Sequence, residues 1–202
     1  MIAFAILAVL AYSIAPASWE SRVLAALALG QDVWGNLVRS INWLGGPLIW
    51  AMIVAVIAAL IWRFRGRAAG ILVALTLVSD LVAFGIKVVI ERDRPDTVAT
   101  QHFFGPDAFS FPSGHVTRAV ALAAVLAWLL APPAWRLRGA LLAGFGAWLA
   151  MGYARVSFGV HWPTDTIAGA LLGLAWFALT TAWLAPLGPE PAPIETVEQP
   201  VA

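Results

Sequence analysis

The sequence predicts an all-α protein, a polytopic membrane bundle of six transmembrane helices with a small extracytoplasmic cap. Three observations support this fold class: the composition, the lengths of the apolar stretches and the positions of the arginines. Of the 202 residues, 61% are hydrophobic and 11% are charged, and the mean hydropathy is +0.86. A soluble domain of ordinary composition has roughly 25% charged residues. The composition therefore indicates an integral membrane protein.

Six apolar stretches define the expected spans, which cover residues 2–17, 46–62, 68–90, 116–131, 139–151 and 164–185. Several approach the ~20 residues that cross a bilayer as a helix. Helices are expected because backbone polar groups in lipid must be bonded within the chain. The first stretch lacks the basic leader of a secretory signal, so it is interpreted as a span. Residues 1–187 are predicted to form one membrane domain, and the Pro- and Glu-rich residues 188–202 a disordered cytoplasmic tail.

The arginines predict how the bundle is oriented in the cell (inner) membrane. Arg63, Arg65 and Arg67 crowd one short connection, and Arg136 and Arg138 occupy another. By the positive-inside rule, both connections face the cytoplasm. The alternate connections, which then face outward, cover residues 18–45, 91–111 and 152–163. The first of these is predicted to contain an interfacial amphipathic helix.

Three polar fragments interrupt this apolar sequence in a fixed order. They are Lys87 with Arg94-Pro95, then Pro112-Ser113-Gly114-His115, then Arg155 with His161 and Asp165. Lys87 is the only lysine among the 12 basic residues. All three fragments lie in the last two outward connections or at the ends of adjoining spans. We therefore expect them to meet at one site on the extracytoplasmic face.

The residue types in these fragments are those that bind and transfer a phosphoryl group. Such a group carries charge on its equatorial oxygens, which fixed cations and amide donors stabilise. Lys87, Arg94 and Arg155 are the candidate cations, and the arginines offer a planar fork. Ser113 can donate its hydroxyl. Gly114 lets the backbone approach the phosphate, at the amino terminus of the following helix.

The spacing of the histidines separates their expected roles. His161 has a carboxylate, Asp165, four residues later, which lies one turn away on a helix. Asp165 can bond one ring nitrogen of His161 and leave the other to attack, so His161 is the predicted nucleophile. The phosphate contacts are expected to need neither a metal nor a cofactor. The sequence contains no cysteine, which excludes a thiolate metal site and a disulfide framework.

Together the fragments resemble the motifs of the type 2 phosphatidic acid phosphatase family, the lipid phosphate phosphatases related to vanadium haloperoxidases. The resemblance covers about residues 46–185. It implies a bacterial membrane enzyme in which His161 forms a phosphohistidine and Asp165 orients it. It also implies that His115 protonates the leaving oxygen and later activates water. One position departs from the family pattern, because Ala154 stands where relatives often have Ser.

The resemblance implies a phosphatase that hydrolyses lipid phosphates or diphosphates, such as a polyprenyl diphosphate, phosphatidic acid or phosphatidylglycerol phosphate. The expected partners are this lipid substrate and membrane lipids, and the oligomeric state is open. A formal net charge of +1 argues against a nucleic-acid surface. Two alternatives are a phosphotransferase that uses the same phosphohistidine and, less favoured, a non-enzymatic bundle that binds or transports phosphate lipids. A vanadate-dependent peroxidase is disfavoured because those relatives are soluble.

Several further residues have open interpretations. Arg118 lies three residues after His115 on the same helical face, and either contacts a second phosphate or headgroup or forms an internal ion pair. Asp80 is two turns from Lys87, about 10 Å, and is expected to bond within the bundle. His102 is interpreted as a loop residue. Four phenylalanines are expected to form an interfacial lip or anchor, namely Phe103, Phe104, Phe109 and Phe111.

Overall fold

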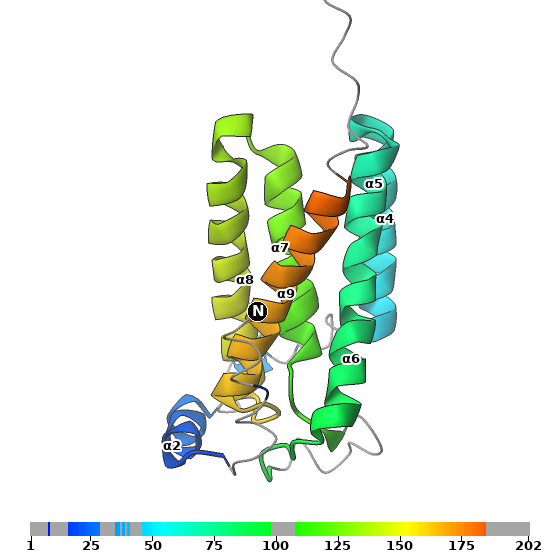
Figure 1. Ribbon diagram of the computed structural model, residues 1–202. Helices are drawn as coiled ribbons and strands as arrows, with labels where there is room; N and C mark the ends of the chain where they lie inside the picture. The colour runs from blue at the N-terminus through cyan, green and yellow to red at the C-terminus, as the bar shows by residue number, and fades with distance from the viewer. Residues whose placement is uncertain are drawn as a thin grey trace, which may run out of the picture.

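In the part of the chain that the structure describes, long helices lie side by side and a short helix lies beside one end of the bundle (Figure 1). The computed structural model describes Ala8 and residues 16–28, 35, 36, 38, 40, 46–97 and 108–184. The elements are α2 (Ser18–Leu27), α4 (Pro47–Arg65), α5 (Arg67–Ala74), η1 (Leu75–Leu77), α6 (Val78–Ile90), α7 (Gly114–Leu130), η4 (Pro133–Trp135), α8 (Arg136–Ser157) and α9 (Pro163–Leu184). Helix α7 packs against α5, α6, α8 and α9. It is therefore the central helix of the described bundle.

Three helices in the described ranges are long and apolar enough to cross a membrane. They are residues 47–65, the continuous run 67–90 and residues 163–184. Helix α7 is apolar but has 17 residues. Helix α8 has 22 residues, but Arg136, Arg138 and Arg155 lower its hydropathy. The helical membrane architecture is thus confirmed, whereas the number of six spans stays a prediction.

Two predicted segments fall largely or wholly outside the described residues. Of the first predicted span, residues 2–17, only Ala8, Pro16 and Ala17 are described. The predicted tail, residues 188–202, lies entirely beyond them. For segment 18–45, the predicted helix is observed as α2, and Gly35, Asn36, Val38 and Ser40 are also helical.

One residue, Gly66, joins the first two long helices. It has a φ of 92°, a conformation that suits glycine because a side chain would be strained there. Helix α4 continues to Arg65 and α5 begins at Arg67, so the predicted connection is shorter than expected and its arginines belong to helix ends. A Cβ on Gly70 would lie 2.6 Å from the Cβ of Trp62. The two helices therefore pack in close contact immediately after the turn.

The run 67–90 contains a 3₁₀ turn, η1, between α5 and α6. Hydroxyls bond local carbonyls here, Thr76 Oγ1 to Val73 O at 2.7 Å and Ser79 Oγ to Thr76 O at 2.6 Å. The indole of Trp176 on α9 donates to the carbonyl of Leu75 at 2.9 Å. Side-chain donors thus bond backbone carbonyls where the helix changes from α to 3₁₀ geometry. Such bonds are needed because lipid offers no hydrogen-bond partner to a backbone group.

Two glycines allow α9 to approach α7 closely. A Cβ on Gly169 would lie 2.7 Å from the carbonyl oxygen of Ser113, and one on Gly173 would lie 2.6 Å from that of Thr117. Small residues at such spacing let membrane helices pack backbone to backbone. Close by, the Ser113 N–H donates to the carbonyl of Asp165 at 3.0 Å. This contact brings the second and third motif fragments together.

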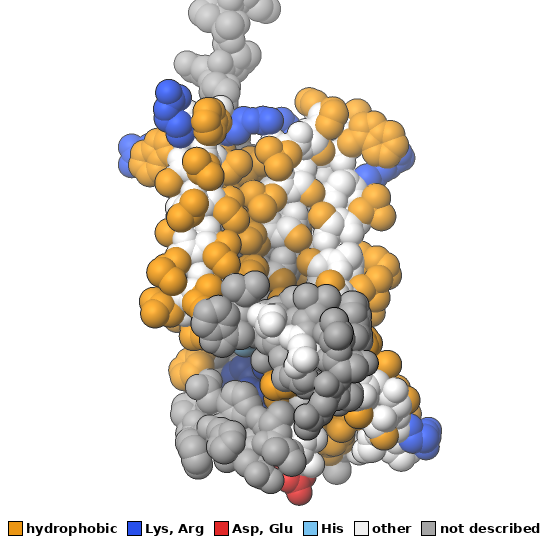
Figure 2. All heavy atoms as spheres, turned by 180° about the vertical axis from the view of Figure 1, so that it is seen from behind, with side chains coloured by type: hydrophobic (Ala, Val, Ile, Leu, Met, Phe, Trp, Pro, Cys, Tyr) orange, Lys and Arg blue, Asp and Glu red, His pale blue; other side chains and the backbone are white. Residues whose placement is uncertain are grey.

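The polar groups lie at the two ends of the bundle, and a wide hydrophobic surface separates them. Figure 2 shows this surface on one face, with basic side chains gathered at the top end. The basic end of α4 and the basic starts of α5 and α8 are at one end of the bundle, while the end of α6 and the starts of α7 and α9 are at the other. Both predicted boundaries of the fifth span are also wrong. Helix α8 begins at Arg136, so Arg136 and Arg138 belong to its first turn and not to a connection. It continues to Ser157, so the connection expected over 152–163 is shorter and Arg155 is in the last helical turn.

Candidate active site

The three motif fragments meet around one cavity of about 350 Å³. It lies where α6 ends and α7 begins, beside the connection between α8 and α9. The predicted residues that line it are Lys87, Arg94, Gly114, His115, Arg118, Arg155 and His161, and Pro47, Asp80 and Phe84 complete the lining. Ser113 and Asp165 are fully buried and do not belong to this lining. The predicted convergence of the fragments is therefore observed.

Lys87 is held by the segment that leads into α7. Its ammonium donates to the carbonyls of Phe109 at 2.8 Å and Ser110 at 3.3 Å. The side chain is buried while it lines the cavity, which favours a role in the site over surface snorkelling. Phe111 in the same segment is 0% exposed, so the expectation of an interfacial lip or anchor is wrong for it. Phe103, Phe104 and His102 lie outside the described residues.

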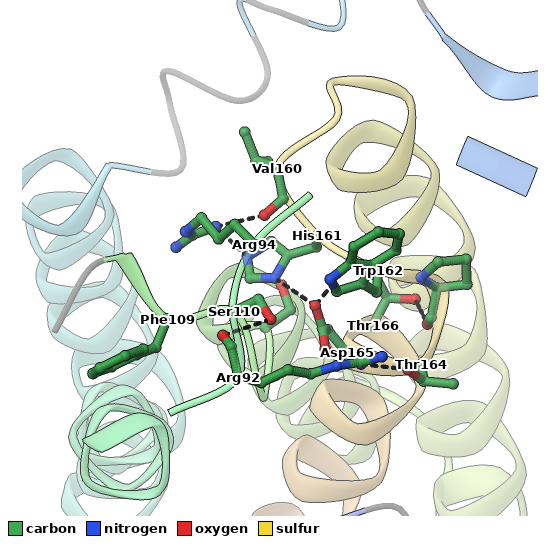
Figure 3. Close-up of polar contacts among 12 residues, drawn as sticks. Arg92, Arg94, Phe109, Ser110, Val160, His161, Trp162, Thr164, Asp165 and Thr166 are labelled. Carbon is green, nitrogen blue, oxygen red and sulfur yellow. Dashed lines mark hydrogen bonds and ion pairs between the residues drawn. The ribbon is translucent and has the colours of Figure 1, made fainter. Parts of the chain in front are cut away.

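Arg94 connects the first fragment with the third. Its Nη1 donates to the carbonyl of Val160 at 2.6 Å and lies 3.3 Å from Nε2 of His161 (Figure 3). Arg155 is 3% exposed and lines the same cavity from the end of α8. A turn at Gly159, with a φ of 73°, reverses the chain between Arg155 and His161. Two guanidinium groups therefore lie beside the histidine predicted to attack.

Ser113 and Gly114 form the start of α7. Ser113 Oγ is buried and has no hydrogen-bond partner among the described residues. A buried hydroxyl is costly unless it bonds, so a partner for this atom is expected. A Cβ on Gly114 would lie 2.8 Å from Oδ1 of Asp80. Gly114 thus accommodates a close carboxylate in addition to its expected role of exposing backbone to the phosphate.

His161 contacts Asp165 as the sequence spacing predicts. Its Nδ1 is 3.4 Å from Oδ2 of Asp165, and the N–H of Trp162 donates to that oxygen at 2.8 Å. Burial, and then the positive charges of Arg94, Lys87 and Arg155, hold the pKa of His161 well below its usual value of about 6.5. The imidazole is therefore neutral at physiological pH. In the tautomer with the proton on Nδ1, facing Asp165, the Nε2 lone pair lies on the side of Arg94.

Arg118 forms the internal ion pair that was one of its two interpretations, and it also lines the cavity. Its Nη1 forms an ion pair with Oδ2 of Asp80 at 2.7 Å, which confirms the bonding role expected for Asp80 within the bundle. The guanidinium also lies 5.9 Å from the ring centre of Trp50. Arg118 and Asp80 both line the cavity, next to His115. The ion pair is consequently part of the site.

Two buried charged residues beside the site, Arg92 and Glu20, were not predicted from the sequence. Arg92 forms ion pairs with Asp165 at 2.7 Å and Glu20 at 2.9 Å. Its position two residues before Arg94, adjoining the first fragment, was the available signal. The sequence contains no pattern that pairs Glu20 with residues more than seventy positions away. Only the packing of α2 against the site makes this contact.

Comparisons with known proteins agree with this geometry. The family model described as the PAP2 superfamily matches residues 68–188. Phosphatidylglycerophosphatase B of Bacillus subtilis is 32% identical over 87% of this chain and 88% of its own length. Undecaprenyl-diphosphatase of Sulfolobus acidocaldarius is 30% identical over 77% of this chain and 70% of its own.

A solved structure also resembles the fold. The crystal structure of a transmembrane PAP2-type phosphatidylglycerolphosphate phosphatase from Bacillus subtilis superimposes with a TM-score of 0.75 at 28% identity. The match covers 92% of this chain and 94% of that one. The extent of the family match and the likeness of the whole chain confirm the resemblance that the motif residues indicated. The protein is a member of the PAP2 superfamily.

Proposed function

We propose that this protein is an integral membrane phosphatase that hydrolyses lipid phosphates or diphosphates through a phosphohistidine. The observation that carries this proposal is the single cavity lined by Lys87, Arg94, Arg155 and two histidines. Cations alone would support the binding of a phosphate but not its transfer. A neutral His161 whose Nδ1 faces a buried carboxylate is the arrangement of an activated nucleophile.

The membrane architecture and the relatives support a lipid substrate. The cavity lies at one end of an apolar bundle, where a headgroup meets the protein while its hydrocarbon stays in the bilayer. The two relatives above are named for phosphatidylglycerophosphate and undecaprenyl diphosphate. Phosphatidylglycerol phosphate and polyprenyl diphosphates are therefore the substrate classes to test first, with phosphatidic acid as the third.

The first chemical step is the attack of His161 Nε2 on phosphorus. A bond from Nε2 to phosphorus forms as the bond from phosphorus to the lipid oxygen breaks. His115 takes up a proton when the anionic substrate offsets the charge of the surrounding cations, and it donates this proton to the leaving oxygen. Lys87, Arg94 and Arg155 compensate the charge on the equatorial oxygens, where Ser113 also donates. Asp165 stabilises the positive charge that develops on the His161 ring.

The second step hydrolyses the intermediate. His115, now neutral, takes a proton from water, whose oxygen attacks phosphorus while the bond to Nε2 breaks. Inorganic phosphate leaves, and both histidines return to their starting states. The phosphate contacts and both proton transfers use residues of this chain alone.

We further propose that the site faces the extracytoplasmic side of the cell (inner) membrane, in a domain of residues 1–187 with six spans and a tail over 188–202. The separation of the basic helix ends from the cavity supports this orientation, because basic residues favour the cytoplasmic side. A lipid carrier or glycerolipid of the outer leaflet would then be the substrate.

Purified protein in detergent micelles, with a chelator present, tests the mechanism through release of inorganic phosphate from phosphatidylglycerol phosphate. The parent is expected to release phosphate and His161→Ala to release none, with Arg138→Gln, at the far end of the bundle, as an active control. Persisting turnover in His161→Ala would contradict the phosphohistidine. Phosphate transfer to another lipid or sugar in place of water would favour the phosphotransferase.

A p-nitrophenyl phosphate ester separates the two histidines, because its leaving group departs without a proton. His115→Ala is expected to release about one equivalent of nitrophenolate per enzyme and then stop, since the phosphohistidine forms but water is not activated. His161→Ala is expected to give no burst. Continuous turnover in His115→Ala would remove its proposed role.

A further inference from the structure

Behind the cavity, three charged side chains form a continuous buried chain of contacts. Arg92 donates from Nη2 to Oε2 of Glu20 at 2.9 Å and from Nη1 to Oδ1 of Asp165 at 2.7 Å. The exposed fractions of these side chains are 6% for Arg92, 3% for Glu20 and 0% for Asp165. A buried ion network is expensive to desolvate, so stability alone is a weak reason for its presence. Its location one contact away from the nucleophile suggests that it serves the site.

Asp165 is held from both sides, and each of its oxygens has a different partner. Oδ1 accepts from Arg92, while Oδ2 accepts from the N–H of Trp162 at 2.8 Å and faces Nδ1 of His161 at 3.4 Å. In Figure 3 the carboxylate of Asp165 lies between the His161 ring and the Arg92 guanidinium. Contacts to both oxygens fix the plane of the carboxylate. The orientation of the imidazole therefore depends on Arg92 through Asp165.

Glu20 extends this chain of contacts to two helices that are far apart in the sequence, α2 and α9. Its Oε1 accepts from the N–H of Thr164 at 3.2 Å and from the Thr164 hydroxyl at 2.7 Å, at the start of α9. Its Oε2 also accepts from the N–H of Ala17 at 3.2 Å, at the start of α2. The Thr164 hydroxyl in turn accepts from Arg92 Nη1 at 2.7 Å. A single carboxylate thus joins the first turns of α2 and α9 to Arg92.

We propose that Arg92 and Glu20 are positioning residues that hold Asp165, and through it His161, in the geometry for attack. Helix α2 is then part of the active-site structure, because its one buried side chain is Glu20. The exposed side of α2 carries Ser21 and Arg22. This inference rests on the proposed function, since it concerns the attacking atom of the same reaction.

The test uses the full-length enzyme in detergent micelles with phosphatidylglycerol phosphate as the probe. Arg92→Gln and Glu20→Gln are expected to lower kcat by about 100-fold, the scale of a misplaced reacting group, while KM changes by less than about 3-fold. KM is preserved because Lys87, Arg94 and Arg155 still bind the phosphate. Arg22→Gln, an exposed change of the same chemistry on α2, is the matched control and retains the parent rate.

A double-mutant cycle separates positioning from a purely structural role. If Arg92 acts through Asp165, adding Arg92→Gln to Asp165→Asn lowers kcat no further than Asp165→Asn alone. The inference would be overturned if the losses in kcat of the two single variants multiply in the double variant. A kcat within about 3-fold of the parent in the folded single variants would also overturn it. Glu20→Gln keeps the shape of the side chain and remains informative if Arg92→Gln does not fold. Activity of the parent and inactivity of His161→Ala in the same assay report on the proposed function separately.

Discussion

At the residue scale, each nitrogen of the His161 ring has its own partner. Nδ1 lies beside Asp165, and Nε2 lies 3.3 Å from Nη1 of Arg94, beside the cavity. Burial lowers the pKa of His161 most, and the same positive charges that would bind a phosphate lower it further, so the ring stays unprotonated. Substrate binding and nucleophile activation therefore depend on one set of cations. The arrival of a phosphate would offset part of that positive charge.

Arg118 allows a test of whether the site prefers diphosphates. Arg118 lines the cavity, three residues after His115, and is paired with Asp80. It can contact a second phosphate only if that phosphate binds on the Arg118 side of the cavity. Arg118→Ala is expected to lower kcat/KM for a polyprenyl diphosphate by about 10-fold more than for the monophosphate. A tenfold change corresponds to about 1.4 kcal/mol, near the lower end of the range for one hydrogen bond to a charged group.

Asp80→Asn is the matched control for Arg118→Ala, because it breaks the same ion pair but keeps the guanidinium. Initial rates on the two lipids, measured in one detergent, give the comparison. Equal losses on both substrates in Arg118→Ala would assign Arg118 to the packing of α6 against α7. A selective loss in Asp80→Asn as well would show that the ion pair positions Arg118 for the second phosphate.

At the element scale, the close approach of α7 and α9 determines the geometry of the site. Gly169 and Gly173 contact backbone carbonyls at the first two turns of α7, next to the Ser113 N–H that bonds Asp165 O. A larger residue at either position would push apart the two helix starts that carry Ser113 and Asp165. The positions of the catalytic groups therefore depend on the close packing of α7 against α9.

Gly173→Ala is expected to lower stability by about 1–3 kcal/mol, the usual cost of overpacking, and to reduce the rate of phosphate release. Its new Cβ would meet Thr117 O at 2.6 Å and the Cβ of Val120 at 3.0 Å. Thermal unfolding in detergent and phosphate release give the two measurements.

Gly146→Ala on α8 is the control, because a Cβ there meets no heavy atom of the described residues within 4 Å. It should be neutral or stabilising, since alanine favours the helix. Equal effects at both positions would contradict the packing argument.

At the scale of the whole molecule, the two ends of the bundle differ in charge and chemistry. The basic end of α4 and the basic starts of α5 and α8 lie at the opposite end of the bundle from the end of α6 and the starts of α7 and α9 (Figure 1). The chain has no cysteine, so single cysteines can report which end faces outward without background reaction. This property makes the proposed orientation directly testable in intact cells.

Asp96→Cys, near the cavity, is expected to react with a membrane-impermeant maleimide added to intact cells. Ala134→Cys, exposed in η4 beside Arg136, is expected to react only after the cells are opened. Both positions are exposed, so accessibility within the protein is matched. The reverse pattern would place the site on the cytoplasmic side, and the proposed outer-leaflet substrates would then be wrong.

The sequence could predict much of this site because its chemistry is local. Lys87 with Arg94, Ser113 with Gly114 and His115, and His161 with Asp165 are each separated by a few residues. The expected contact of the last pair is observed, although His161 precedes α9, which begins at Pro163, so the two residues do not share a helix. The length and apolarity of the stretches likewise predicted membrane helices. Boundaries were less predictable, because α8 continues to Ser157 through polar and basic residues that hydropathy assigns to a connection.

Taken by itself, the amino-acid sequence determined the helical membrane architecture, the family and the residue types of the site. Tertiary structure alone decided that Phe111 is buried, that Arg118 pairs with Asp80, and that Glu20 reaches Arg92. The physical reason is that hydrophobic patterning and local spacing act along the chain. Ion pairs between distant segments depend instead on which helices pack together, and no pattern within a single segment encodes that choice.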